Sequence, residues 1–219
     1  MEKYHYDPEE YPNLKRLAGE MIPCLETEAG WQDREIKETF PGRDQSFLAV
    51  GITLGKGIDA LQEKYLQNGF LTESYMIEVL SSELLLKSYR AYTEWVVVHR
   101  NLHVARLHFL GGGETSESQI GSLLRLANLP MLLQELALPV TCNAAYCMIP
   151  KKSVVFYAEL TKDPFTKCAG ICLGCGRRDC PNRMEEKENF PLRFADMTDR
   201  PLSYGYARIF SKSTDENGR

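Results

Sequence analysis

The chain has 219 residues, 26 Lys plus Arg against 30 Asp plus Glu, and 43% hydrophobic residues, as is usual for folded domains. Its net charge of −4 comes from interspersed charges of both signs, which excludes the broad basic surface that holds a nucleic-acid backbone. The sequence contains no apolar run of roughly 18 residues and does not start with a secretory signal, so we expect a cytoplasmic protein with no membrane partner. The length predicts a single domain over residues 1–219.

The first half of the chain predicts helices interrupted by two short strands. Apolar side chains recur at helical spacing in the helical segments, whereas the strand candidates are short apolar runs bounded by glycine or proline. In chain order, the expected elements are a helix over residues 12–29, strands over 36–40 and 47–54, and helices over 55–67 and 71–98. Pro23 is expected to kink or break the first helix, and Gly30 to end it.

The second half predicts mainly strands. Two runs rich in Val, Tyr and Phe are separated by Ile149-Pro150-Lys151-Lys152 and are expected to pair as a hairpin. The expected elements are a strand over residues 102–110, a helix over 115–126, the hairpin strands over 140–148 and 153–160, and a strand over 202–210. Because helices and strands do not alternate strictly, the pattern favours an α+β fold in which helices cover a mainly antiparallel sheet.

Four of the seven cysteines lie in a Cys-rich segment over residues 164–185. They are Cys168, Cys172, Cys175 and Cys180, with the spacing C-x3-C-x2-C-x4-C. This spacing lets thiolates from one loop converge on a zinc ion or an iron-sulfur cluster. In a reducing compartment, clustered thiols favour metal ligation over a disulfide or unligated cysteines, and both alternatives stay open, as does the identity of the metal.

Three glycines at residues 111–113 follow the strand that carries Arg106. The backbone N–H groups of such a turn can bind a carboxylate or phosphate, with the arginine supplying charge, but three glycines before a helix are also typical of a plain flexible turn. His99, His103 and His108 straddle a helix end and a strand start, so we interpret them as ordinary histidines rather than metal ligands.

The segment VTCNAAYCMIPKKSVVFYAEL resembles a signature of the activation domain of vitamin B12-dependent methionine synthase. In that family Met-x-Pro-x-x-Ser-Val lies between two strands of a sheet, and the matching residues here are Met148, Pro150, Ser153 and Val154. Stand-alone relatives of the domain are similar in following the hairpin with C-x2-C-x4-C-x-x-R, present here as Cys172, Cys175, Cys180 and Arg183. The order and spacing of the two motifs extend the resemblance over residues 10–185.

The family also has a strand ending in Arg, followed by Pro-Gly-Tyr, which holds S-adenosylmethionine. The matching stretch is RLHFLGGGE, in which Arg106 and Gly111 align with the family's arginine and glycine, Gly112 replaces the tyrosine, and the proline is absent. The resemblance implies a cofactor-binding set of Arg106, Gly111, Gly112, Met148, Pro150 and Ser153. An arginine for the ligand carboxylate and backbone groups near a glycine turn would supply the polar cradle that this sulfonium ligand needs.

The resemblance implies an auxiliary module of a methyltransferase rather than a complete enzyme. Such a module binds S-adenosylmethionine and supports the reductive reactivation and methylation of a partner, either a corrinoid protein or methionine synthase, which carries the cobalamin. The alternative is a small metal-binding or iron-sulfur protein, for electron transfer or as a scaffold, that has lost S-adenosylmethionine binding. The missing tyrosine favours the alternative, whereas Arg106 and the intact signature favour the first reading.

The cysteine spacing yields a direct prediction of metal content. Protein purified anaerobically should contain one zinc site or one iron-sulfur cluster, and Cys172→Ser should lower its occupancy, because ligation needs every thiolate. Elemental analysis with thiol titration measures both quantities. Less than about 0.2 equivalents of zinc or iron, with all thiols titratable in the folded protein, would contradict the prediction.

Overall fold

The computed structural model describes residues 7–34, 46–111 and 119–166. Several sequence expectations lie outside these residues. They are the strands over 36–40 and 202–210, Gly112, and the predicted metal ligands Cys168, Cys172, Cys175 and Cys180.

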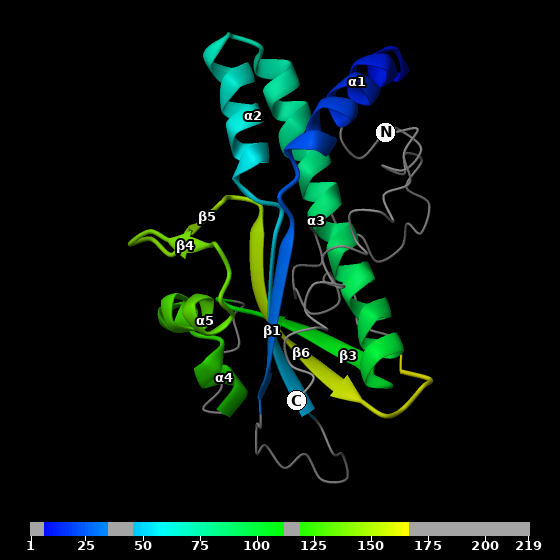
Figure 1. Cartoon of the computed structure of the whole chain (residues 1–219), viewed down its shortest axis with the longest axis vertical. Helices are drawn as coiled ribbons and strands as arrows, with labels where there is room; N and C mark the ends of the chain where they lie inside the picture. Colours follow the sequence, from blue (N-terminus) through cyan, green and yellow to red (C-terminus); the bar gives the residue numbers. More distant parts are fainter. Residues whose placement is uncertain (1–6, 35–45, 112–118, 167–219) are drawn as a thin grey trace.

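Four strands form one antiparallel sheet in the order β1-β2-β6-β3 (Figure 1). They are β1 (Glu28–Arg34), β2 (Ser46–Thr53), β3 (His103–Phe109) and β6 (Ser153–Thr161). The central strands, β2 and β6, consist almost wholly of buried residues, as their continuous apolar sequences predict. Together with the helices on both faces, the sheet confirms the α+β fold class with a mainly antiparallel sheet.

Helix α3 (Leu71–Arg100) takes part in two cores. Its C-terminal half packs across one face of the sheet, where the Tyr92 and Phe156 rings lie 5.6 Å apart. Its N-terminal half packs against α1 (Tyr11–Met21) and α2 (Lys56–Gln67) in a helical cluster beyond the end of the sheet (Figure 1). Neither α3 nor any other helix in the described ranges combines the length and the hydropathy needed to cross a bilayer.

The opposite face of the sheet is covered by α5 (Leu129–Glu135), which follows α4 (Gln119–Leu123) and a 3-10 turn at Leu126–Asn128. The core on this side joins apolar residues of β2 and β6 to leucines around α5: Phe47, Ala49, Val155, Tyr157, Leu129, Leu132, Leu133 and Leu136. The sheet therefore separates two cores, and a third lies in the helical cluster.

Two facing glycines allow the chain after α5 to approach the sheet closely. Gly30 on β1 pairs with Gly51 on β2, and a Cβ on Gly30 would lie 2.4 Å from the carbonyl oxygen of Leu136. A Cβ on Gly51 would lie 2.3 Å from the Leu138 side chain. A side chain at Gly30 would push this segment off the sheet, whereas one at Gly51 would displace the Leu138 side chain.

Five predicted elements are confirmed to within two residues at each end. They are the strands over 47–54, 102–110 and 153–160 and the helices over 55–67 and 71–98. The first helix is shorter than predicted: α1 ends at Met21, and Ile22–Cys24 form a 3-10 turn, since Pro23 cannot donate an α-helical hydrogen bond. Gly30 consequently lies inside β1. In the described part of the predicted helix over 115–126, only Gln119–Leu123 is α-helical.

The predicted hairpin between residues 140–148 and 153–160 is wrong. Strand β6 pairs with β2 and β3, whereas β4 (Thr141–Cys142) pairs with β5 (Met148–Ile149) in a ribbon of their own. The turn lies at residues 143–147 instead, because the Asn143 side-chain oxygen accepts the N–H groups of Ala145 and Cys147. Polar turn chemistry inside the first predicted strand therefore overrides its strand-like composition.

Two helical glycines yield a matched stability prediction. A Cβ on Gly57 in α2 would lie 2.2 Å from the carbonyl oxygen of Cys24, whereas a Cβ on Gly19 in α1 would meet no atom within 4 Å. Gly57→Ala should lower the free energy of unfolding by about 1–3 kcal/mol, and Gly19→Ala should raise it by up to about 1 kcal/mol. Urea denaturation followed by circular dichroism measures both changes. Equal effects of the two substitutions would contradict the packing described here.

Candidate functional site

The turn at residues 150–153, which contains the signature proline and serine, is held against β2 by hydroxyl groups. The Ser153 hydroxyl donates to the carbonyl oxygen of Pro150 at 2.7 Å and lies 2.8 Å from the Thr53 hydroxyl. The Thr53 oxygen accepts the N–H of Gly55 at 3.1 Å. Because each hydroxyl has a single proton, Thr53 donates to Ser153. The proton of the buried Ser153 hydroxyl is thus used to hold the turn.

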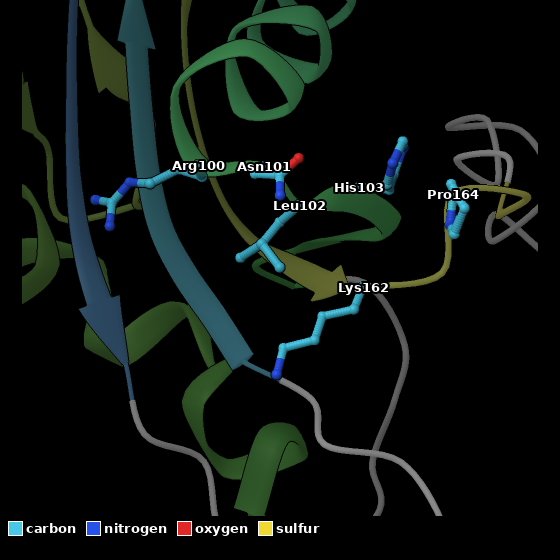
Figure 2. A pocket seen from close by; sticks show the side chains of 6 residues that line it. All are labelled: Arg100, Asn101, Leu102, His103, Lys162 and Pro164. Atoms are coloured by element: carbon cyan, nitrogen blue, oxygen red, sulfur yellow. The ribbon is translucent and has the colours of Figure 1, made fainter.

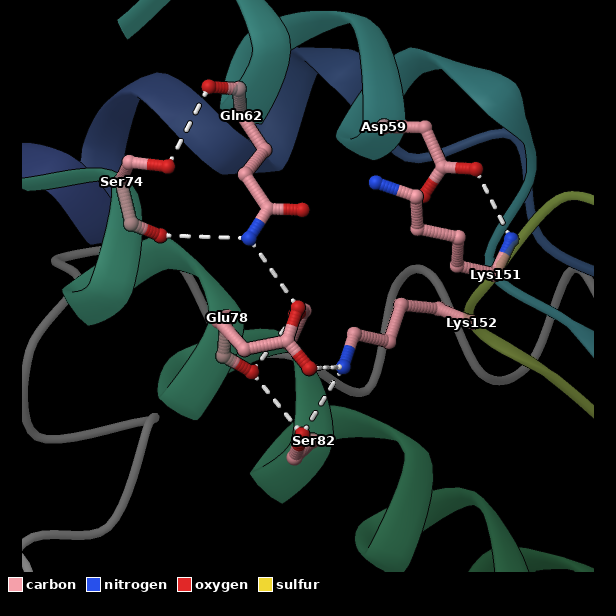
Figure 3. A network of polar contacts seen from close by, with 8 residues as sticks. Asp59, Gln62, Ser74, Glu78, Ser82, Lys151 and Lys152 are labelled. Carbon is pink, nitrogen blue, oxygen red and sulfur yellow. Dashed lines mark hydrogen bonds and ion pairs between the residues drawn. The ribbon is translucent and has the colours of Figure 1, made fainter. Parts of the chain in front are cut away.

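The buried side chain of Lys152 joins the same turn to the helical cluster (Figure 3). Its ammonium group forms an ion pair with Glu78 of α3 and lies 3.0 Å from the Ser82 hydroxyl. The other carboxylate oxygen of Glu78 accepts a hydrogen bond from Gln62 of α2 at 3.1 Å. The Glu78 carboxylate therefore links two helices to the turn at residues 150–153, called here the signature turn.

The Glu78 carboxylate is ionised at neutral pH. Partial burial raises its pKa, but the hydrogen bond and the positive charge of Lys152 outweigh that effect, helped by Gln62. The pKa of Glu78 consequently lies below its ordinary value of 4.5. The charged form of the pair is the one that stabilises the folded protein.

A bulge in β3 decides which face of the sheet carries Arg106. The register shifts between Val104 and Arg106, so that Val104 pairs with Leu160 and Arg106 pairs with Glu159. Without the extra residue, Arg106 would share the face of Val104, which packs toward α3. The bulge instead places the exposed Arg106 side chain on the α5 side, beside Glu159.

His108 belongs to the same face of β3. Its Nε2 lies 3.0 Å from Oε2 of Glu159, and because an ionised carboxylate only accepts hydrogen bonds, Nε2 is the donor. The side chains of His108 and Glu159 are 7% and 15% exposed. Arg106, Glu159 and His108, called here the charged row, thus combine an outward arginine with a carboxylate that is largely shielded from water.

Gly111 follows β3 with φ of 76°, a left-handed conformation that favours glycine. Its N–H donates to the carbonyl oxygen of Leu124 at 2.8 Å. A Cβ at this position would also lie 3.1 Å from the Leu126 side chain. The glycine is therefore needed for the φ angle and for packing against Leu126, and its N–H is already used inside the protein.

The charged row and the signature turn lie toward opposite ends of β6. At a rise of roughly 3.3 Å per residue, Ser153 and Glu159 are about 20 Å apart along the strand. Met148 lies on β5, half-buried against the α5-side core, and is close in sequence and space to Pro150 and Ser153. The structure therefore groups the three signature residues with one another and separates them from Arg106.

An open hollow of about 520 Å³ lies at the C-terminal end of α3 (Figure 2). It is lined by Arg100, Asn101, Leu102, His103, Lys162 and Pro164. Figure 2 shows its basic side chains diverging, with Arg100 extending toward β1, where its guanidinium lies 3.4 Å from the Asp33 carboxylate. Because the positive charges do not converge, the hollow is not arranged to bind an anion.

No sequence pattern singles out Glu159, Lys152 or Glu78, and the spacing of His108 is that of an ordinary histidine. Their partners are distant along the chain, by 51 residues for His108 and Glu159 and by 74 for Glu78 and Lys152. Alternation along the strand does place Arg106 and His108 on one face, and this sequence pattern could have indicated that the two side chains lie together. The acidic partner depends on tertiary pairing.

Within residues 7–34, 46–111 and 119–166, no three His, Cys, Asp or Glu side chains are grouped so that they could hold a metal ion. The predicted metal ligands of the Cys-rich segment lie outside this part of the chain. Comparisons of the chain with protein-family models and with curated proteins find no match.

The Glu78–Lys152 pair yields a prediction for pH dependence. At pH 7, Glu78→Gln should lower the free energy of unfolding by about 1–3 kcal/mol, because the buried ammonium loses its counter-charge. The lowered pKa of Glu78 means that this stabilisation is present above about pH 4.5 and is lost as the pH falls through the folded-state pKa. The difference in the free energy of unfolding between wild type and Glu78→Gln should therefore be smaller at about pH 3 than at pH 7, and urea denaturation at both pH values measures it.

Glu94→Gln is the control, since Glu94 is an exposed carboxylate on the same helix. It should leave the free energy of unfolding nearly unchanged at both pH values. A loss for Glu78→Gln that is equal at the two pH values would show that the charge of Glu78 is not its source.

Proposed function

We propose that this protein is a stand-alone relative of the activation domain of cobalamin-dependent methionine synthase. It binds S-adenosylmethionine and supports the reductive reactivation and methylation of a corrinoid protein, or of methionine synthase, in the cytoplasm. The observation that carries the ligand half of the proposal is the exposed Arg106 side chain on the sheet face that leads to the Gly111 turn.

The charge and the exposure of Arg106 support this choice of ligand. The Arg106 guanidinium can form a bidentate, charge-assisted pair with the α-carboxylate of S-adenosylmethionine. Arg106 and Gly111 are separated by at most about 17 Å along an extended strand, a span suited to the two ends of a nucleoside joined to an amino acid.

The signature turn supports the proposal indirectly. Its proline, serine and lysine hold β6 against β2 and against the helical cluster. Strand β6 also carries the register partner of Arg106, so one strand joins the anchored turn to the charged row. In the proposed role, cobalamin stays on the partner protein, where its inert oxidised form is rescued by one-electron reduction coupled to methyl transfer.

The proposal predicts the effect of one substitution on ligand affinity. Arg106→Ala should raise the dissociation constant for S-adenosylmethionine about ten- to a hundredfold, because a charge-assisted hydrogen bond contributes about 1.5–3 kcal/mol. Arg16→Ala is the control, since Arg16 is an exposed arginine on α1 in the helical cluster. Isothermal titration calorimetry on anaerobically purified protein measures both variants.

Absence of binding at millimolar S-adenosylmethionine would favour the alternative of a small metal-binding or iron-sulfur protein. Equal affinities of wild type and Arg106→Ala would remove the arginine from the site. Cobalamin reduction in a corrinoid protein, assayed with and without this chain, tests the second half of the proposal. Ligand binding with no effect on that reduction would leave a ligand-sensing protein.

A further inference from the structure

We propose that Glu159 binds the α-ammonium group of the ligand while Arg106 binds its α-carboxylate, so that the charged row recognises a free α-amino acid head group. This inference rests on the proposed function and deepens it. It assigns a specificity-determining residue that the signature motif does not contain.

The charges of the row match those of an amino-acid zwitterion. Arg106 and Glu159 are register partners across an antiparallel pair, which places their Cβ atoms about 4.5–5.5 Å apart on one face of the sheet. A positive and a negative group at this spacing can face the adjacent carboxylate and ammonium of one α-carbon. A phosphate or a simple carboxylate would gain from the arginine alone and would be repelled by Glu159.

His108 positions the acidic half of the row. Its Nε2 holds Oε2 of Glu159 at 3.0 Å, and the ring is itself fixed by burial beside Phe47, with ring centroids 6.1 Å apart. A carboxylate accepts up to about four hydrogen bonds, so Glu159 can hold His108, its other contacts and an ammonium group together. A carboxylate held in place and mostly shielded from water binds an ammonium more strongly than a freely moving surface glutamate does.

The arrangement also has a purely structural reading, in which the row is a cross-strand ion pair. Ligand chemistry separates the two readings. A structural role would make any loss on substitution independent of whether the ligand has an ammonium group. Direct recognition makes the loss specific to ligands that carry one.

The test uses S-adenosylmethionine and its 2-oxo-acid analogue, S-adenosyl-4-methylthio-2-oxobutyrate, which keeps the carboxylate and the sulfonium but lacks the ammonium. Wild-type protein should bind S-adenosylmethionine about ten- to a hundredfold more tightly than the analogue. Glu159→Gln should weaken the binding of S-adenosylmethionine by a similar factor and should not weaken the binding of the analogue, because the analogue has no ammonium group and is relieved of repulsion from Glu159. Glu28→Gln, an exposed carboxylate on β1, is the matched control and should change neither affinity.

The outcomes are separable by calorimetry. Equal weakening of both ligands by Glu159→Gln, or no weakening of either, overturns the inference and leaves the proposed function standing. Equal affinity of the wild type for the two ligands overturns it without any variant, which covers the case in which Glu159→Gln fails to fold. Failure of the wild type to bind either ligand refutes the proposed function itself.

Discussion

Pairing of β6 with β2 on one side and β3 on the other is the constraint from which the rest of the described structure follows. It places residues 153–161 at the centre of the sheet, where one face packs under α3 and the other under α5. A strand in that position must be apolar on both faces, and the burial pattern of β6 meets this requirement almost throughout. The two residues of β6 that are not fully buried are Glu159 and Thr161, and both lie opposite the edge strand β3.

The start of β6 is anchored by polar rather than apolar contacts. Lys152 forms its ion pair with Glu78 across the junction between the sheet and the helical cluster, and the N–H of the preceding Lys151 donates to Asp59 of α2 at 2.8 Å. Polar contacts of this kind are directional, so they fix how the turn sits on the helices more tightly than apolar packing does. In this protein, the signature turn therefore holds one end of the central strand β6 in place.

At the other end of β6, the bulge in β3 places a charged side chain of the edge strand beside Glu159. One extra residue between Val104 and Arg106 moves the arginine from the side of the α3 core to the side of Glu159. Since β3 is an edge strand of the described sheet, the charged row lies at one margin of the sheet. The proposed ligand site depends on this irregularity more than on the glycine turn, whose first amide is already bonded to Leu124.

The amino-acid sequence by itself determined the fold class and the long elements, because helical spacing over residues 71–98 and continuous apolar runs over 47–54 and 153–160 are local patterns that packing reinforces. Local patterns were insufficient where a short-range alternative competed, as at Asn143, whose side chain turns the chain inside a strand-like run. The tertiary structure alone decided the partners of Lys152 and His108, because their contacts join residues 74 and 51 positions apart. It also decided on which face of the sheet Arg106 lies. A bulge depends on how two distant strands align, and it cannot be recognised from the alternation of residues in either strand alone.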